Sequence, residues 1–152
     1  MRPREDSPAR PEDRPYFFDG GLRFGCTGCG ACCTGASGTV WVNAKEAARI
    51  ARHLGLALKA FLRRYAYPFR HGHSLRERAN GDCVFFDAGR CTIYRVRPTQ
   101  CRTYPFWPEH VRTEAAWSRV CRECPGAGRG PLHSRERILD LVGRALDAER
   151  AP

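Results

Sequence analysis

Four cysteines lie within eight residues near the start of the chain, in the segment Cys26-Thr27-Gly28-Cys29-Gly30-Ala31-Cys32-Cys33. The residues between them are small, and glycine allows backbone conformations and close approaches that bulkier residues do not. A set of thiolate ligands needs a short loop of this kind, without side-chain bulk around the metal. The segment therefore indicates a metal or iron–sulfur site, and the rest of the chain must bring further cysteines to it.

Cys26, Cys29 and Cys32 follow the spacing C-x2-C-x2-C. Zinc sites usually take their ligands as separate C-x2–4-C pairs. Three cysteines at successive x2 spacing instead hold three corners of a [4Fe–4S] cluster in bacterial ferredoxins, where the remote ligand is a cysteine followed by proline. Cys124-Pro125 has that form. The spacing therefore favours an iron–sulfur cluster, with [4Fe–4S] as the expected type, and Zn²⁺ is the alternative.

Cys33 directly follows Cys32, and neighbouring side chains leave the backbone in different directions. Two adjacent cysteines would bind a single ion only under strain, so we expect Cys33 to serve another corner or another site. Cys121 precedes Cys124 at x2 spacing and is interchangeable with it in this scheme, or is a small buried hydrophobic residue. The hypothesis divides eight thiols into two sets, Cys26, Cys29, Cys32 and Cys124, and Cys33, Cys83, Cys91 and Cys101.

Three arginines, Arg95, Arg97 and Arg102, flank the segment from Cys91 to Cys101. Guanidinium groups would offset the negative charge of clustered thiolates and lower their pKa values. We therefore expect Arg97 and Arg102 to contribute to binding the cofactor. Ordinary ion pairs with acidic residues nearby are the alternative explanation for these arginines.

The composition bounds the compartment and the partners. Nine cysteines in 152 residues indicate either a disulfide scaffold or a metal protein. The odd number fits a full disulfide set poorly, although a disulfide or a buried pair is the alternative for Cys83 and Cys91. No apolar signal segment and no run of about 18 apolar residues occurs, so we expect a cytoplasmic protein without a membrane span, in which thiols stay reduced.

The formal net charge of +10 leaves nucleic-acid binding open. Of the 26 basic residues, only Lys45 and Lys59 are lysines, and the arginines do not form one unbroken tract. A solvated basic surface is the simpler interpretation. A nucleic-acid partner is therefore not favoured, and a redox or cluster-transfer protein is the partner that the cysteines suggest.

The elements that must position the cysteines follow from hydrophobic spacing. Residues 1–15 carry both charge signs and four prolines, which predicts a disordered tail before one domain at 16–150. Asn43 and Glu46 predict a capped helix that ends near Gly55, and a second helix is expected over Leu58–Tyr65. Strands are expected over 39–42, 74–79, 83–86 and 91–94, with a hairpin turn at Asn80-Gly81.

The C-terminal part is expected to contain a helix around Thr113–Val120 that delivers Cys121 and Cys124. A Gly/Pro-rich loop at 125–131 follows, and Ser134 caps a last helix. Together these patterns predict a small, irregular, single-domain α+β fold. Short helices and a small antiparallel β-hairpin are tied together by a multi-cysteine metal site.

The segments that carry these cysteines, between about Phe24 and Gly130, together resemble the YkgJ-like cysteine-cluster family. The members of that family are described as zinc- or iron-chelating proteins. The resemblance implies that Cys121 stands outside the family pattern. It implies metal ligands at Cys26, Cys29, Cys32, Cys33, Cys83, Cys91, Cys101 and Cys124.

Three functions remain open from the sequence. The leading one is a metal-binding protein that holds an iron–sulfur cluster or zinc and has a redox or metal-handling role. The second is an enzyme that uses the cluster for redox chemistry or methyl transfer, by analogy with the longer flagellin lysine methylases that share the cysteine motif. The third is a zinc-stabilised module that binds nucleic acid through its arginines.

Overall fold

The structure is a computed structural model that describes residues 14–34 and 38–151. The expected disordered tail lies outside the described residues except for Arg14 and Pro15. The side chain of Phe18 is only 1% exposed, so the first buried aromatic residue falls where the sequence predicts that order begins. No helix in the described part of the chain is long and apolar enough to cross a membrane.

The first half of the chain builds two helices against a three-stranded antiparallel sheet. Helix α1 (Ala44–His53) begins with the predicted capping box, in which Asn43 accepts from the amide of Glu46 and the Glu46 carboxylate accepts from the amide of Asn43. Helix α2 spans Leu58–Tyr65, as predicted. The sheet has the order β2-β4-β3, and its strands are β2 (Trp41–Val42), β3 (Ala66–Phe69) and β4 (Gly72–Leu75).

The predicted hairpin at Asn80-Gly81 is wrong in its strands. Strand β4 ends at Leu75 and pairs with β2 and β3, so the turn is flanked by an isolated antiparallel bridge between Glu77 and Cys83 rather than by two strands. Strand β3 contains Pro68, and it lies at the edge of its sheet, where a missing N–H is tolerated. The hairpin that does form joins β5 (Phe86–Asp87) to β6 (Arg90–Cys91) through Ala88 and Gly89.

The expected loop at 125–131 is also wrong, because most of it forms strand β7 (Ala127–His133). This strand pairs antiparallel with β1 (Leu22–Phe24), with an irregularity after Arg23. Helix α4 (Glu114–Glu123) leads into it and is capped by the hydroxyl of Thr113. The pairing brings the residues just before the cysteine loop against the residues just after Cys124.

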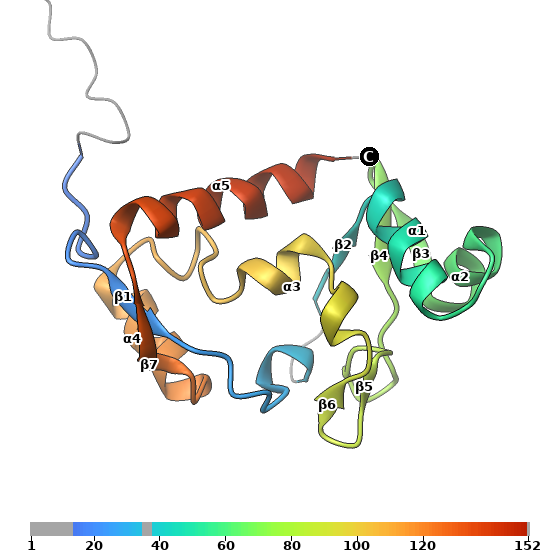
Figure 1. The fold of residues 1–152 in the computed structure, drawn as a ribbon, viewed down its shortest axis with the longest axis horizontal. Coiled ribbons are helices and arrows are strands. Elements are labelled where there is room, and N and C mark those ends of the chain that lie inside the picture. Colours follow the sequence, from blue (N-terminus) through green and yellow to red (C-terminus); the bar gives the residue numbers. More distant parts are fainter. Residues whose placement is uncertain (1–13, 35–37, 152) are drawn as a thin grey trace, which may run out of the picture.

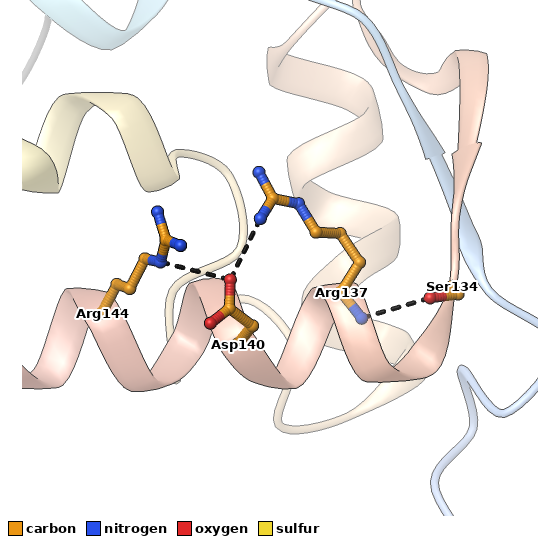
Figure 2. Close-up of polar contacts among 4 residues, drawn as sticks. All are labelled: Ser134, Arg137, Asp140 and Arg144. Atoms are coloured by element: carbon orange, nitrogen blue, oxygen red, sulfur yellow. Dashed lines mark hydrogen bonds and ion pairs between the residues drawn. The ribbon is translucent and has the colours of Figure 1, made fainter.

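The last helix, α5 (Arg135–Arg150), begins as predicted at Ser134, whose hydroxyl accepts from the amide of Arg137 at 3.2 Å. Its exposed side carries Asp140, which pairs with Arg137 at 3.0 Å and with Arg144 at 3.2 Å (Figure 2). The helix crosses the molecule above the short helix α3 (Thr99–Thr103), as Figure 1 shows.

The buried apolar residues form two separate clusters. The first lies among β1, α4, β7 and α5 and includes Phe18, Phe106 and Ile138. The second lies among α1, α2 and β4 and includes Ile50, Phe61 and Phe85. In Figure 1 the elements around the first cluster are on the left and those around the second on the right. The cysteine loop and the β5–β6 hairpin lie between them, at the lower edge.

The described part of the chain therefore has five α-helices and three small antiparallel sheets. This confirms a small α+β fold.

Candidate metal centre

The cysteine loop is shaped by a glycine and a short helical turn. Gly30 has a φ of 77°, which favours glycine, and it precedes the 3₁₀ turn η2 (Ala31–Cys33). A β-carbon on Gly30 would collide with the ring of Phe86 in the β5 strand. The amide of Cys83 donates to the carbonyl of Cys33 at 2.8 Å, so the loop and the segment before the hairpin are joined directly.

Two adjoining small cavities lie behind this loop. One, of about 50 Å³, is lined by the cysteines of the loop, the hairpin and helix α3: Cys26, Cys32, Cys33, Cys83, Cys91 and Cys101. The other, of about 70 Å³, is lined by Cys26, Cys29, Cys32, Cys101 and Cys124. All four cysteines of each set predicted from the sequence thus line the same cavity, together with other residues. Cys26, Cys32 and Cys101 line both cavities, so the two sets adjoin rather than form distant sites.

Helix α3 carries Cys101 and is held by the first helix. The residue before this helix, Pro98, has no side chain that could accept a hydrogen bond from its first turn. Instead, the buried carboxylate of Glu46 accepts from the amide of Thr99 at 2.7 Å and from its hydroxyl at 2.6 Å. Gln100 adds a second connection, because its side chain bonds both backbone groups of the β2 region, Trp41 N–H and Thr39 C=O. These contacts fix the direction from which Cys101 approaches the cavities.

Cys124 ends helix α4 and belongs to the first core cluster, with 6% of its surface exposed. Tyr104 lines the second cavity together with Cys124, and burial together with the negative charge of nearby thiolates raises the pKa of Tyr104. Cys121 lines neither cavity, and its sulfur faces Gly128 of β7. Burial also raises the pKa of Cys121, which agrees with a packed thiol rather than an activated one.

Three sulfurs around the first cavity share one hydrogen-bonded network. The Cys33 thiol bonds to Cys32 and to Cys91, which raises the pKa of Cys33 and lowers the pKa of Cys32 to about 7 and that of Cys91 to about 6. Burial raises the pKa of Cys83 and of Cys101, and the neighbouring sulfurs raise them further. Uncompensated negative charge thus accumulates at this point as the thiols ionise, and a bound cation would neutralise it.

Arginines supply positive charge at the two cavities. Arg97 lines both cavities and lowers the pKa of Cys32 and of Cys91, after the larger effect of the Cys33 thiol. Arg102 lines the second cavity. Among the described residues, Arg95, Arg97 and Arg102 form no ion pair with a carboxylate, and the last two donate instead to the carbonyls of Tyr94 and Arg95.

The donor chemistry fits a thiophilic metal. Thiolates are soft ligands that select Zn, Cu(I) and iron–sulfur clusters. Within the described ranges 14–34 and 38–151, no three His, Cys, Asp or Glu side chains are already arranged to hold one ion. Three of the loop cysteines, Cys26, Cys29 and Cys32, are exposed.

The sequence did not identify two side chains that line the cavities beside the cysteines. Tyr94 lines the first cavity together with Cys26, and Tyr104 lines the second together with Cys124. An aromatic side chain in a Pro-rich segment is most simply interpreted as part of the core. The only available signal was their position, three residues after Cys91 and three residues after Cys101.

Comparison with known proteins agrees with the cysteine pattern. Residues 25–125 match the CxxCxxCC family model, described as "Putative zinc- or iron-chelating domain". Among curated proteins, the chain is 33% identical over 88 residues to "Uncharacterized protein MJ0661" of Methanocaldococcus jannaschii, an alignment covering 57% of this chain and 46% of that protein. The chain thus spans less than half the length of this relative. No solved structure matches.

Proposed function

The chain belongs to the CxxCxxCC family, whose description is zinc- or iron-chelating, and from this premise we propose that it binds iron–sulfur clusters through eight cysteine thiolates, in two sets of four. Metal binding is the function that family membership carries. The identity of the metal and the ligand set are the further steps of the proposal. The ligands are the six cysteines that line the first cavity, with Cys29 and Cys124 completing the second.

One observation carries the ligand set. Eight of the nine cysteines, drawn from five separate segments, line two adjoining cavities, and the ninth, Cys121, does not. Cysteines are often buried as small apolar residues, but packing alone gives no reason for eight of them to share the same two hollows. A common ligand does give that reason.

The C-x2-C-x2-C spacing and the Cys124-Pro125 pair favour an iron–sulfur cluster over zinc, as they do in bacterial ferredoxins. The surroundings suit such a centre as well. The hydroxyls of Tyr94 and Tyr104 and the charge of Arg97 would stabilise sulfur ligands and raise the potential of a cluster, which supplies one-electron chemistry when bound.

The experiment is purification without oxygen, followed by metal and sulfide analysis and a visible spectrum. An iron–sulfur protein is expected to show iron, acid-labile sulfide and a broad absorption band near about 400 nm. A colourless protein that contains only zinc would overturn the cluster and leave a closed structural zinc site as the function.

A specific cavity favours a second candidate, an enzyme. A hollow of about 300 Å³ adjoins Cys33 and Cys83 and is also lined by Glu77, Glu109 and Trp107. It is large enough for a small substrate beside the cluster. Calorimetric titration with S-adenosylmethionine separates the two functions, because a methyl-transfer enzyme binds it and an electron carrier or metal-storage protein does not.

A further inference from the structure

The cysteine loop lies at the surface and not in the middle of the molecule. Cys26, Cys29 and Cys32 are exposed, and a β-carbon on Gly28, at the tip of the loop, would meet no atom within 4 Å. In Figure 1 the loop forms the lower edge of the molecule beside the β5–β6 hairpin. A centre held by this loop is therefore open to contact by another macromolecule.

An exposed aromatic residue stands beside the loop. Tyr94, in the 3₁₀ turn η3 (Tyr94–Val96), is 45% exposed although it lines the first cavity together with Cys26. The guanidinium of Arg97 lies 3.7 Å from the centre of its ring and is held there by a 2.9 Å bond from Nε to the Tyr94 carbonyl. Tyrosine and arginine are the residues most enriched at the centres of protein interfaces.

The surface around Tyr94 is positively charged. Arg95 follows it in the same turn, Arg90 lies on β6 next to Cys91, and Arg102 bonds to the carbonyl of Arg95 at 3.2 Å. In the described part of the chain, none of Arg90, Arg95, Arg97 and Arg102 is paired with a carboxylate. The arginines of α5 differ, because Arg137 and Arg144 share the charge of Asp140 (Figure 2).

Two further observations show that this charge is not neutralised from below. The Nε of Arg49 is buried without a hydrogen-bond partner while its other nitrogen bonds the Arg97 carbonyl at 3.0 Å. Arg102 is likewise held by a backbone carbonyl, that of Arg95, rather than by a carboxylate. The acidic side chains on adjacent elements are few: Glu46 faces inward onto Thr99, and Asp87 stands opposite Arg90 in the hairpin.

We propose that the face formed by Arg90, Tyr94, Arg95, Arg97 and Arg102 docks a small acidic redox protein over the cysteine loop. This inference rests on the proposed iron–sulfur function, because electron exchange needs the partner close to the centre. The unpaired arginines steer an acidic protein to this face, and Tyr94 lies at the contact while lining the same cavity as Cys26. A nucleic acid is less suited, because one ring already covered by Arg97 gives no stacking platform.

The test uses oxidised plant-type ferredoxin, an acidic redox protein, as the probe. Its affinity for the metal-loaded full chain is measured by calorimetry at low and at moderate ionic strength. The Arg90→Glu/Arg95→Glu variant changes the net charge by the same amount as the control variant Arg52→Glu/Arg63→Glu, which alters exposed positions at the ends of α1 and α2. Metal content is measured for all three proteins.

We expect the Arg90/Arg95 variant to bind ferredoxin at least about tenfold more weakly and the control variant to stay within about twofold. Added salt should weaken the wild type more than the Arg90/Arg95 variant. The proposal would be overturned if the Arg90/Arg95 variant and the control variant bound ferredoxin equally weakly, or if neither bound it more weakly than the wild type. A single-stranded oligonucleotide is tested in parallel. The proposal would also be overturned if the Arg90/Arg95 variant bound the oligonucleotide more weakly than the wild type does but bound ferredoxin equally well.

The measurements distinguish failure of the docking proposal from failure of the proposed iron–sulfur function. If the wild-type chain holds no iron, the proposed cluster is wrong whatever the affinities. If it holds iron and sulfide while ferredoxin binds all three proteins equally, the cluster stands and the docking face is wrong.

Discussion

At the scale of single residues, the difference between Cys29 and Cys121 is the clearest test of the ligand set. Cys29 lines the second cavity and is exposed, whereas Cys121 lies against Gly128 and lines neither cavity. Losing one hydrogen-bond partner of a metal ligand costs a metal site about 10–100-fold in affinity, so losing a ligand itself should cost at least about 100-fold.

We therefore expect Cys29→Ser to lose metal when it is purified beside the wild type, and Cys121→Ser to retain it. Metal stoichiometry by mass spectrometry and chelator competition give the measurement. Full metal content in Cys29→Ser, or loss in Cys121→Ser, would contradict the ligand set.

Two glycines of the loop form a second matched pair. Gly30 and Gly28 have φ values of 77° and 71°, so alanine at either position is strained by about 1–2 kcal/mol. Only at Gly30 would the new methyl group also strike the ring of Phe86, and such overpacking adds about 1–3 kcal/mol.

We expect Gly30→Ala to be less stable than Gly28→Ala by that additional amount and to bind metal more weakly. Chemical denaturation of both variants measures the difference. Equal free energies of unfolding would mean that the loop does not rest on Phe86.

At the scale of elements, one carboxylate connects the start of α1 to the start of α3. Glu46 is 4% exposed and accepts from Asn43, from the Thr99 amide and from the Thr99 hydroxyl. Its capping-box role could be read from the sequence, because Asn43 and Glu46 stand three residues apart before an apolar repeat. Its role at Thr99 could not, because that partner is 53 residues away.

The Glu46→Ala variant would leave two backbone amides without acceptors, and a buried unsatisfied donor costs about 1–3 kcal/mol. We expect a loss of about 3 kcal/mol in the free energy of unfolding, together with weaker metal binding through the displacement of Cys101. Glu114→Ala, at an exposed first-turn position of α4, is the control and should cost less than about 1 kcal/mol. Similar losses in the two variants would contradict the tertiary role of Glu46.

At the scale of the whole molecule, the proposed centre lies between two apolar cores. Cys124 belongs to the first core cluster, while Cys83 and Cys91 pack against the second. Metal bound by all of them would link the two halves, which are otherwise joined through α3 and α5. A ligand that binds only the folded state stabilises it by about 4 kcal/mol at a thousand times its Kd.

Removal of the metal by a chelator should therefore lower the melting temperature by roughly 10 °C, and the single unfolding transition should broaden as the two halves lose their link. Differential scanning calorimetry of the loaded and stripped protein measures both effects. An unchanged melting curve would show that the metal does not hold the halves together. Reloading the stripped protein controls for irreversible damage.

The sequence by itself determined the local structure and the kinds of ligand. Helices α1, α2, α4 and α5 follow from apolar repeats and from the caps at Asn43, Thr113 and Ser134, which act within one turn. The cysteine spacing also identified the family, because metal ligands must occur at short, regular intervals.

Only the tertiary structure shows which segments of the chain pair with one another. Strand β7 contains Gly128, Gly130 and Pro131, and Gly126 precedes it, so its own residues do not favour a strand. It becomes a strand because it pairs with β1, which lies more than a hundred residues away in the sequence. The same holds for Tyr94 and Tyr104, which line the cavities beside Cys26 and Cys124 from distant segments. Non-local contacts leave no periodic trace in the sequence, so the arrangement of the eight cysteines around two shared cavities emerges only when the chain is folded.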